Sequence, residues 1–400
     1  MMNRRNFLQV GSRVGISSLL VGAGVNQFAM AQTAHAIKSV QQSGPLIVVF
    51  LRGGADGLGI LSPLEDPNFI AARAPQMNFS PTDNPVILDG TKLFWHPKAQ
   101  PLSELMMAGR LVPWPAVGLT NETRSHFEAQ EIIERGVDQL SSLPDSLGMM
   151  TRIATGKLKD DSFLFSAGNN LPRAMQGNLP AIAIRDLQNG IGFPGGVSNL
   201  SILAQLAKVD QAHPAAATMY KTLHQLFRIQ KTLDPTFETN SKPIKPYESK
   251  GKTPYANNNP STGLRSIARL LSVDIPLQYA WVDHDGWDMH EGHPYRMPNM
   301  LGQLSQGLQA FDEDMQAQKK NYTLVVLTEF GRRFRSNGSN GTDHGHGSLS
   351  LVMGSHVPKN QVMGHWPGLT EKDLDRGVDL SVTTPYQDVL NLAMQWGQIG

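Results

Sequence analysis

The fold prediction starts from Leu46-Ile47-Val48-Val49-Phe50-Leu51-Arg52-Gly53-Gly54-Ala55-Asp56-Gly57. Its first six residues are continuously apolar and rich in β-branched side chains, which is typical of a strand buried on both faces of a parallel sheet. The glycines that follow let the backbone turn sharply and approach a ligand closely. Asp56 is therefore expected to project into a crevice as a ligand for a hard metal ion. An Asp-Gly turn without a ligand is the alternative interpretation.

Similar apolar runs recur along the chain and predict further buried strands at residues 181–184, 278–282, 322–328 and 349–353. Between them, apolar residues step by three and four at 219–227 and 301–315, which is typical of amphipathic helices. Strands that alternate with helices indicate an α/β fold, with a mostly parallel sheet covered on both faces in a three-layer sandwich. Ligands in such folds bind at the carboxyl ends of the strands.

Composition excludes several classes of protein and site. Of the 400 residues, 40% are hydrophobic and 17% charged, which supplies a sizeable core. The formal net charge of +1 provides no field suited to a nucleic-acid partner. The chain has no cysteine, which excludes disulfides, thiolate zinc sites, iron–sulfur clusters and a cysteine nucleophile. We expect a single α/β domain at 32–400, with a flexible insertion near 234–262 that is rich in Pro, Asn and Lys.

The N-terminus is expected to act as an export signal. Arg4 and Arg5 precede Phe7-Leu8 and a Gly-rich, weakly apolar stretch, a pattern that resembles a twin-arginine signal peptide. Cleavage is expected after Ala31, or after a second small-residue site at 34–36. An uncleaved membrane anchor is the alternative, but polar residues interrupt the roughly 20 apolar residues that a bilayer span requires. Removing residues 1–31 deletes three arginines and no acid, so the net charge goes from +1 to −2. The sequence predicts a periplasmic protein that meets the twin-arginine translocase during export and has no stable membrane span.

A helix is expected to begin near Ser125. Ser125 and Glu128 form a capping-box pattern, which explains both residues without catalysis. The same position at a helix N-terminus stabilises an anion or an alkoxide, so Ser125 is also a candidate nucleophile. Arg124 and His126 beside it are candidates to hold a phosphate or sulfate group.

The densest polar cluster is Asp283-His284-Asp285-Gly286-Trp287-Asp288-Met289-His290-Glu291-Gly292-His293, after a predicted strand. Asp288 and His290 are two residues apart and point the same way in an extended loop. A carboxylate and an imidazole in that arrangement suit Zn²⁺ or Mn²⁺, with Ca²⁺ or Mg²⁺ as further candidates. The alternative is a solvated loop, but the adjacent tryptophans favour burial.

A last cluster follows the strand predicted at 322–328. Glu329 ends that strand, and Asp343, His344 and His346 lie in a Gly-rich loop before the next one. Carboxylates and imidazoles that recur at the ends of several strands of one sheet indicate one convergent metal site.

The clusters together resemble the bacterial family known as domain of unknown function fifteen-oh-one, of the alkaline phosphatase-like superfamily that includes the sulfatases. The matching motifs extend over nearly the whole mature chain. They are Leu51-Arg52-Gly53-Gly54-Ala55-Asp56-Gly57, His96-Pro97, Ser125-His126-Phe127-Glu128-Ala129-Gln130, Gly286-Trp287-Asp288-Met289-His290, Glu329-Phe330-Gly331-Arg332 and Gly341-Thr342-Asp343-His344-Gly345-His346-Gly347.

The resemblance implies an alkaline phosphatase-like fold, Ser125 as nucleophile, and a metal pair on Asp56, Asp288, His290, Asp343, His344 and His346. The sulfatases form their formylglycine from the Cys or Ser of a C/S-x-P-x-R motif. This chain has no cysteine and no Ser-x-Pro-x-Arg sequence, so a formylglycine sulfatase is not expected. Glu329-Phe330 stands where the superfamily has an Asp-His pair, so either Glu329 or Asp343 is the ligand.

The functional hypothesis is therefore a periplasmic, metal-dependent hydrolase of a small anionic ester or an envelope polymer. A non-catalytic periplasmic binding or assembly protein that retains the fold is the alternative. A copper oxidase is a weaker third reading, because copper sites favour imidazole and sulfur over carboxylate.

Overall fold

The described part of the chain lies in the second of two compact units, residues 39–400. A computed structural model describes residues 43–79, 86–87, 91–142, 147–159, 161–188, 190–191, 199, 202, 205, 214–234, 244–359 and 361–399. The predicted signal peptide, residues 1–31, lies outside the described residues.

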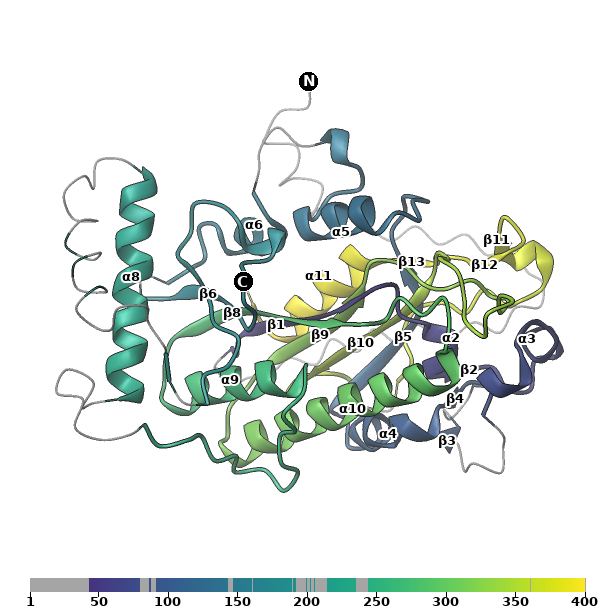
Figure 1. The fold of residues 1–400 in the computed structure, drawn as a ribbon, viewed down its shortest axis with the longest axis horizontal. Helices are drawn as coiled ribbons and strands as arrows, with labels where there is room; N and C mark the ends of the chain where they lie inside the picture. The colour runs from purple at the N-terminus through teal and green to yellow at the C-terminus, as the bar shows by residue number, and fades with distance from the viewer. Residues whose placement is uncertain are drawn as a thin grey trace, which may run out of the picture. The chain divides into compact units, whose positions relative to one another are not determined.

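An eight-stranded sheet forms the middle of this unit (Figure 1), in the order β13-β5-β10-β9-β1-β8-β6-β7. Its neighbouring strands run parallel except for β10, which is antiparallel to both β5 and β9. The strands are β1 Leu46–Arg52, β5 Leu111–Gly118, β6 Phe163–Ser166, β7 Ala181–Ala183, β8 Leu277–Asp285, β9 Thr323–Thr328, β10 Ser348–Gly354 and β13 Thr384–Pro385.

Alternate residues of β1 pack against different helical layers. Ile47 and Val49 belong to the apolar core under α4, α9 and α10, whereas Val48 and Phe50 belong to the core under α5, α6 and α11. These two layers lie on opposite faces of the sheet (Figure 1). The helices are α4 Gln100–Met107, α5 His126–Arg135, α6 Met149–Ala154, α9 Ser261–Ser272, α10 His293–Ala317 and α11 Tyr386–Trp396.

The remaining elements are shorter or peripheral. They are α2 Gly57–Ile60, α3 Pro67–Ala72 and α8 Pro214–Leu233, a three-stranded sheet of β2 Leu61–Ser62, β4 Phe94–Trp95 and β3 Val86–Ile87, and a hairpin of β11 Leu374–Asp375 and β12 Asp379–Leu380. Among the helices of the described ranges, none combines the length and the apolar character that crossing a bilayer requires.

The predicted three-layer α/β fold with a mostly parallel sheet is confirmed by this topology. The strand predicted at 349–353 is present as β10, but it is the antiparallel member. Three strands of the sheet, β5, β6 and the two-residue β13, were not predicted. β5 contains Pro113 and Pro115, which cannot donate main-chain hydrogen bonds and so argue against a strand within a sheet.

Residues 244–260, in the segment expected as an insertion, have no regular secondary structure and lie against α10. Asp314 of α10 accepts hydrogen bonds from the hydroxyls of Tyr247 and Tyr255 at 2.7 and 3.1 Å, and from the main-chain N–H of Lys250 at 3.0 Å. Because Asp314 is fully buried, these bonds fix the segment to the α10 layer.

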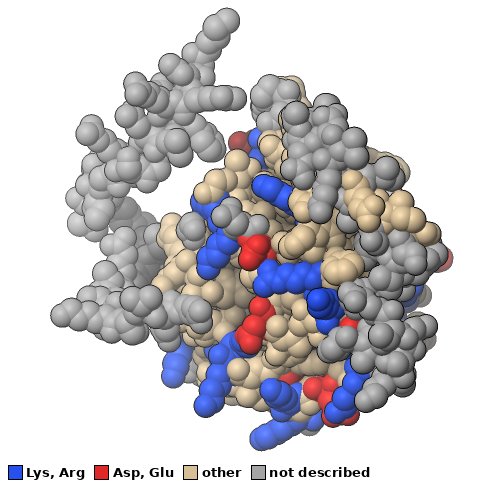
Figure 2. Space-filling view, turned by 90° about the vertical axis from the view of Figure 1, so that its left-hand side faces the viewer, with Lys and Arg blue, Asp and Glu red and all other residues tan. Residues whose placement is uncertain are grey.

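Charges of both signs share the face seen in Figure 2, which is the side of Figure 1 where α8 is drawn. Lys and Arg side chains lie scattered among uncharged residues, with Asp and Glu between them. Arg228 of α8 lies 3.6 Å from Asp161, and Lys245 lies 3.6 Å from Glu248. No broad area of a single sign appears among the described residues of this face.

Candidate metal centre

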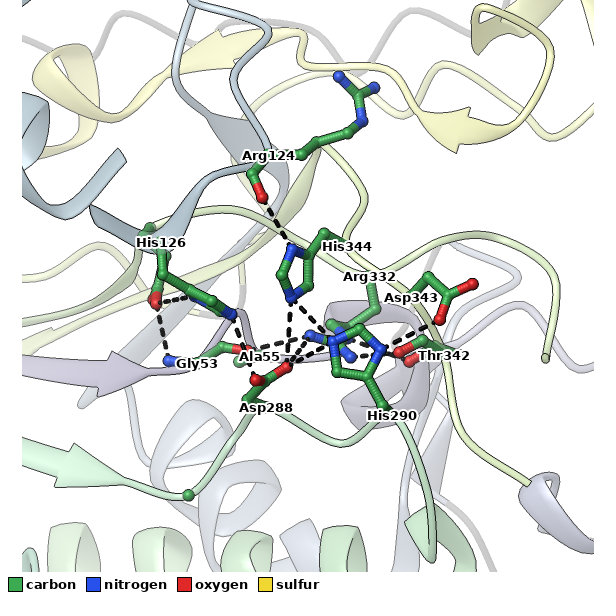
Figure 3. A network of polar contacts seen from close by, with 12 residues as sticks. Gly53, Ala55, Arg124, His126, Asp288, His290, Arg332, Thr342, Asp343 and His344 are labelled. Atoms are coloured by element: carbon green, nitrogen blue, oxygen red, sulfur yellow. Dashed lines mark hydrogen bonds and ion pairs between the residues drawn. The ribbon is translucent and has the colours of Figure 1, made fainter. Parts of the chain in front are cut away.

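The candidate site lies where the carboxyl ends of three neighbouring parallel strands meet. The register places the last residue of β1, Arg52, beside Asp285 of β8, and Leu51 beside Thr328, the last residue of β9. Loops that leave these strands, together with the N-terminus of α5, bring four side chains into one group (Figure 3): His126, Asp288, His290 and His344.

The carboxylate of Asp288 lies between three imidazole rings. Its Oδ2 is 3.4 Å from Nε2 of His126, and its Oδ1 is 3.1 Å from Nε2 of His290 and 3.3 Å from Nε2 of His344. The Nε2 atoms of His290 and His344 are 2.9 Å apart. Each ring therefore directs the same nitrogen, Nε2, toward the centre of the group. The side chains of Asp288 and His290 are 44% and 45% exposed, so solvent reaches them.

The other nitrogen of each ring, Nδ1, faces an oxygen of the protein. Nδ1 of His344 donates to the main-chain carbonyl of Arg124 at 2.7 Å, because a carbonyl oxygen only accepts. Nδ1 of His290 lies 3.0 Å from a carboxylate oxygen of Asp343, and Nδ1 of His126 lies 2.9 Å from a carboxylate oxygen of Glu329. With Nδ1 protonated, the lone pair of a neutral ring is on Nε2.

These residues fit a divalent cation. The ligand atoms of His126, Asp288 and His344 all lie within 4.8 Å of one another. Nε2 of His126 is buried and, among the described residues, has no hydrogen-bond partner. The lone pairs of two imidazoles repel each other at 2.9 Å unless a proton or a cation lies between them, which applies to His290 and His344. Imidazole nitrogens with a carboxylate oxygen are the donors that Zn²⁺ and Mn²⁺ accept.

Local electrostatics favour the ligand forms of two of these groups. Burial raises the pKa of Asp288, but a hydrogen bond and the charge of Arg332 outweigh it and bring that pKa below its ordinary value. Burial lowers the pKa of His344. The hydrogen bond to Glu329 raises the pKa of His126. A proton and a metal ion therefore compete for Nε2 of His126 up to a higher pH than at an ordinary histidine.

The sequence left open whether Glu329 or Asp343 is a metal ligand. In the structure each carboxylate contacts Nδ1 of an imidazole, on the side of the ring away from Asp288. Glu329 is fully buried, and its Oε1 accepts from the main-chain N–H of Gly53 at 2.8 Å and from Gln130 at 2.9 Å, besides His126. Asp343 is half exposed and accepts from Asn337 as well as from His290. Carboxylates that hold the distal nitrogen of a ligand histidine fix its orientation and raise its basicity.

Arg332 is fully buried and holds Asp288. One guanidinium nitrogen donates to Oδ1 of Asp288 at 2.8 Å and to the main-chain oxygen of Gly53 at 3.2 Å, and the others donate to the hydroxyl and carbonyl oxygens of Thr342. Every bond of this side chain is therefore to the protein. The next residue, Arg333, is exposed.

Ser125 is the N-cap of α5, as expected from the sequence. Its hydroxyl accepts from the N–H of Glu128 at 3.5 Å. The carboxylate of Glu128 does not complete the capping box, because it accepts from the hydroxyl of Thr123 at 2.8 Å. Ser125 is exposed and directly precedes His126. The hydroxyl is thus free of strong hydrogen bonds at a helix N-terminus beside a candidate ligand.

The side chain of Arg124 points away from the imidazoles (Figure 3). Its guanidinium donates twice to Asp379, from Nε at 2.9 Å and from a terminal nitrogen, and once to Asp375 at 2.9 Å. Its main-chain oxygen accepts from His344. These contacts favour a role in positioning the loop over the anion-binding role expected from the sequence.

Two further candidates lie outside the group. The carboxylate of Asp56 is buried, accepts two hydrogen bonds from Arg73, and lies 2.9 Å from Nε2 of His293. His346 has Nδ1 2.9 Å from Asp375 and Nε2 2.9 Å from the carbonyl of Leu119. Asp56 and His346 therefore bind other parts of the protein, and neither is hydrogen-bonded to a member of the group around Asp288.

Two glycines permit the close approach of the loops. A Cβ on Gly53, whose φ is +116°, would lie 2.2 Å from the main-chain nitrogen of Asp288. A Cβ on Gly341 would lie 2.1 Å from the main-chain oxygen of His290. A side chain at either position would displace the loop that carries a candidate ligand.

Sequence reasoning missed two features of the site. His126 was expected to bind an anion, yet it lies in the metal-binding group, and Gln130 was passed over as part of a helix. Gln130 stands four residues after His126, and residues so spaced share one helix face, which was the signal available. Their common partner Glu329 is about two hundred positions away in sequence, which no local pattern reveals.

A family model matches residues 133–390, well over half of the chain, and its description is "Protein of unknown function (DUF1501)". The matched range contains Asp288, His290, Glu329 and His344, and begins seven residues after His126. No curated protein matches the chain.

Several solved structures are similar to the chain at low identity. The C-terminal periplasmic domain of EcEptC from Escherichia coli, in a complex with Zn, has 10% identity and a TM-score of 0.36, over 78% of this chain and 73% of that one. A protein in the alkaline phosphatase superfamily from Vibrio parahaemolyticus has 12% identity and a TM-score of 0.34, over 81% and 63%. The alkaline phosphatase from the Antarctic bacterium TAB5 has 9% identity and a TM-score of 0.35, over 90% and 100%.

Proposed function

This chain belongs to the family of unknown function DUF1501, as its motifs predicted, and we propose that it is an exported, metal-dependent hydrolase of a phosphate or other anionic ester. One observation carries the proposal. Three imidazoles direct Nε2 toward the carboxylate of Asp288, and each has Nδ1 against a protein oxygen. That donor set is typical of a catalytic metal site that remains open to solvent.

The proposed ligands are His126, Asp288 and His344, with His290 as a fourth. Zn²⁺ or Mn²⁺ suits these donors best. A bound cation would supply Lewis-acid stabilisation of the charge that develops on the ester oxygens. The role of this chain's own residues is to hold each imidazole with Nε2 unprotonated, and the buried guanidinium of Arg332 keeps Asp288 ionised.

Ser125 is the proposed nucleophile. It is exposed at the N-terminus of α5, where the helix dipole and free N–H groups stabilise an alkoxide, and it adjoins a proposed ligand. For a phosphate ester, the bond from Oγ to phosphorus forms as the bond to the leaving oxygen breaks, and the serine proton ends on the released alcohol. Water then cleaves the phosphoserine, which restores the hydroxyl and releases phosphate.

The proposed substrate is a small anionic ester or a charged polymer of the cell envelope. Export through the twin-arginine translocase, with cleavage of the signal peptide, would place the protein in the periplasm where such polymers are found. The twin arginines and the small-residue sites within residues 1–36 support this export step.

One observation favours a non-catalytic binding or assembly protein as the second candidate. Asp56, which the superfamily resemblance implies as a metal ligand, is engaged by Arg73 and His293. The described cluster then has ligands for one cation, and not for the pair that the resemblance implies.

Turnover separates the two candidates. Protein purified without chelators and supplied with Zn²⁺ or Mn²⁺ is assayed on aryl phosphate, phosphonate and sulfate esters, with His344→Ala as the control for a contaminating hydrolase. The hydrolase proposal expects turnover that the variant lacks. Metal binding without turnover on any of these esters would reject the hydrolase in favour of the binding protein.

A further inference from the structure

A directed series of hydrogen bonds lies behind His126. Arg52, at the end of β1, donates to Oε1 of Gln130 at 3.0 Å. Nε2 of the same amide donates to Oε1 of Glu329 at 2.9 Å, and that carboxylate oxygen lies 2.9 Å from Nδ1 of His126. The series connects β1, α5 and the end of β9 to one face of the candidate site.

Arg52 sets the direction of the first two bonds in the series, and a main-chain donor sets that of the third. A guanidinium only donates, so the amide oxygen of Gln130 must face Arg52 and the amide nitrogen must face Glu329. Oε1 of Glu329 also receives the main-chain N–H of Gly53 at 2.8 Å, a group that only donates. That oxygen is therefore an acceptor, and the ring of His126 must present a protonated Nδ1 to it.

The surroundings hold the series in place. Residues 126, 130 and 134 are spaced by four on α5, so their side chains lie on one face of the helix. Arg52 is fixed by Glu134 at 2.9 Å and by Asp283 at 2.8 Å, and its side chain is 19% exposed. Glu329 is fully buried. Water therefore has little access with which to replace these bonds.

We propose that Gln130 is a positioning residue, which fixes the ring of His126 with Nδ1 protonated and the lone pair of Nε2 directed at Asp288 and His344. A ring flipped about its axis, or protonated on Nε2, would offer that group no lone pair. The consequence for metal affinity rests on the proposed function, whereas the state of the ring does not.

The first test uses wild-type protein without metal and needs no variant. Nitrogen-15 NMR of histidine-labelled protein distinguishes a protonated Nδ1 from a protonated Nε2 for each ring, at a pH where the ring is neutral, and His126→Gln identifies the signal of His126. The inference expects the Nδ1-protonated form of His126. Finding the Nε2-protonated form would overturn it, whether or not the protein binds metal or hydrolyses any ester.

The second test removes the amide. Gln130→Met has a similar volume but neither donor nor acceptor, so Glu329 loses the bond that aligns its carboxylate with His126. Nδ1 of His126 still faces an acceptor and should keep its proton, but the ring should be held less firmly. We expect Zn²⁺ binding weaker by about 10-fold, the lower end for partners of ligand residues. Zn²⁺ affinity is measured by competition with a chromophoric chelator. Glu131→Gln is the matched control on the same helix, because it loses contacts with Arg135 and Arg173 and touches neither Glu329 nor His126.

The outcomes separate this inference from the proposed function. If Gln130→Met binds Zn²⁺ within twofold of wild type, Gln130 does not position His126. If wild type binds no Zn²⁺, the proposed function fails, while an Nε2-protonated His126 in the NMR experiment would still overturn the inference separately. If Gln130→Met does not fold, an Nε2-protonated His126 in wild type still overturns the inference, which requires Nδ1 to carry the proton.

Discussion

The main-chain carbonyl oxygen of Arg124 accepts a hydrogen bond from Nδ1 of His344 at 2.7 Å, across 220 positions of sequence. The same segment supplies the N-cap residue Ser125 and the candidate ligand His126. Three consecutive residues thus hold one ligand, supply a second, and present the proposed nucleophile. The contacts that fix Arg124 therefore also help to fix His344, Ser125 and His126.

Asp379 is expected to stabilise both the fold and the site through Arg124. Asp379 is fully buried and pairs with Arg124, whose side chain is 18% exposed. Asp379→Ala leaves Arg124 with one of its two ion pairs, that with Asp375, and should cost about 3 kcal/mol of unfolding free energy, as for a broken buried pair. It should also weaken Zn²⁺ binding, because the carbonyl that holds His344 loses its anchor. Urea unfolding and chelator competition measure the two effects.

Arg376→Ala provides the comparison for Asp379→Ala. It removes an ion pair with Glu122 in which both side chains are more than half exposed, so it should cost less than about 1 kcal/mol. Equal stability and equal Zn²⁺ affinity of the two variants would show that Asp379 does not support the site.

Ser125 is expected to be needed for turnover beyond its role as a helix cap. Ser125→Asp keeps an N-cap acceptor, whereas Ser125→Ala loses the cap at a cost of about 1 kcal/mol. Both should lose turnover on an aryl ester while the Asp variant keeps its melting temperature, since a carboxylate there cannot become an alkoxide. Wild-type turnover by the Asp variant would remove Ser125 from the mechanism.

His284 is expected to make the metal-free protein less stable as the pH falls. Burial lowers the pKa of His284 to about 3, against about 6.5 for an unfolded chain. Between these values the unfolded state binds a proton that the folded state does not. The contribution of the neutral His284 ring to the free energy of unfolding is therefore complete above pH 6.5, and it is lost progressively as the pH falls toward 3. From pH 7 to pH 5 the loss from this group is about 2 kcal/mol.

The variant His284→Gln isolates this contribution. It has no titrating ring and keeps an acceptor for the indole N–H of Trp287, which lies 3.3 Å from Nδ1 of His284. Urea unfolding at pH 7 and pH 5 should show a smaller loss of stability in His284→Gln than in wild type. The same loss in both proteins would mean that His284 titrates normally.

Export is expected to depend on the twin arginines. Replacing Arg4 and Arg5 with lysine keeps the charge but removes the signal, so unprocessed precursor should accumulate in the cytoplasm. Immunoblots of cytoplasmic and periplasmic fractions measure this. Normal processing of the double variant in the periplasm would argue for another route.

Much of the fold could be predicted from the period of apolar residues. The run from Leu46 to Leu51 is apolar at every position, and the structure buries its alternate residues under two helical layers. β5 was not predicted because Pro113 and Pro115 argue against a strand, although the structure pairs this strand on both sides. The direction of β10 also could not be predicted, since an apolar run does not reveal the orientation of its neighbours.

The sequence identified residues of the site, but it could not tell which of them are direct metal ligands and which hold a ligand in place. Asp288, His290 and His344 were candidates because they follow strands of one sheet, whose ends converge. Whether a carboxylate lies inside the group or behind a ring depends on contacts between distant segments, as with Glu329 and His126. Asp56 forms a buried ion pair with Arg73 and lies outside the group, and none of the motifs contains Arg73.

The central claim is that His126, Asp288 and His344 hold a divalent cation together. Elemental analysis of wild-type protein purified without chelators tests it most directly, with Asp288→Asn and His344→Ala beside it. We expect about one equivalent of Zn or Mn per wild-type chain, far less in both variants, and a melting temperature that rises on adding the metal only in wild type, because a ligand of the folded state stabilises that state. Wild-type protein that contains no transition metal and gains no stability from Zn²⁺ or Mn²⁺, or variants that retain the full metal content, would contradict the claim.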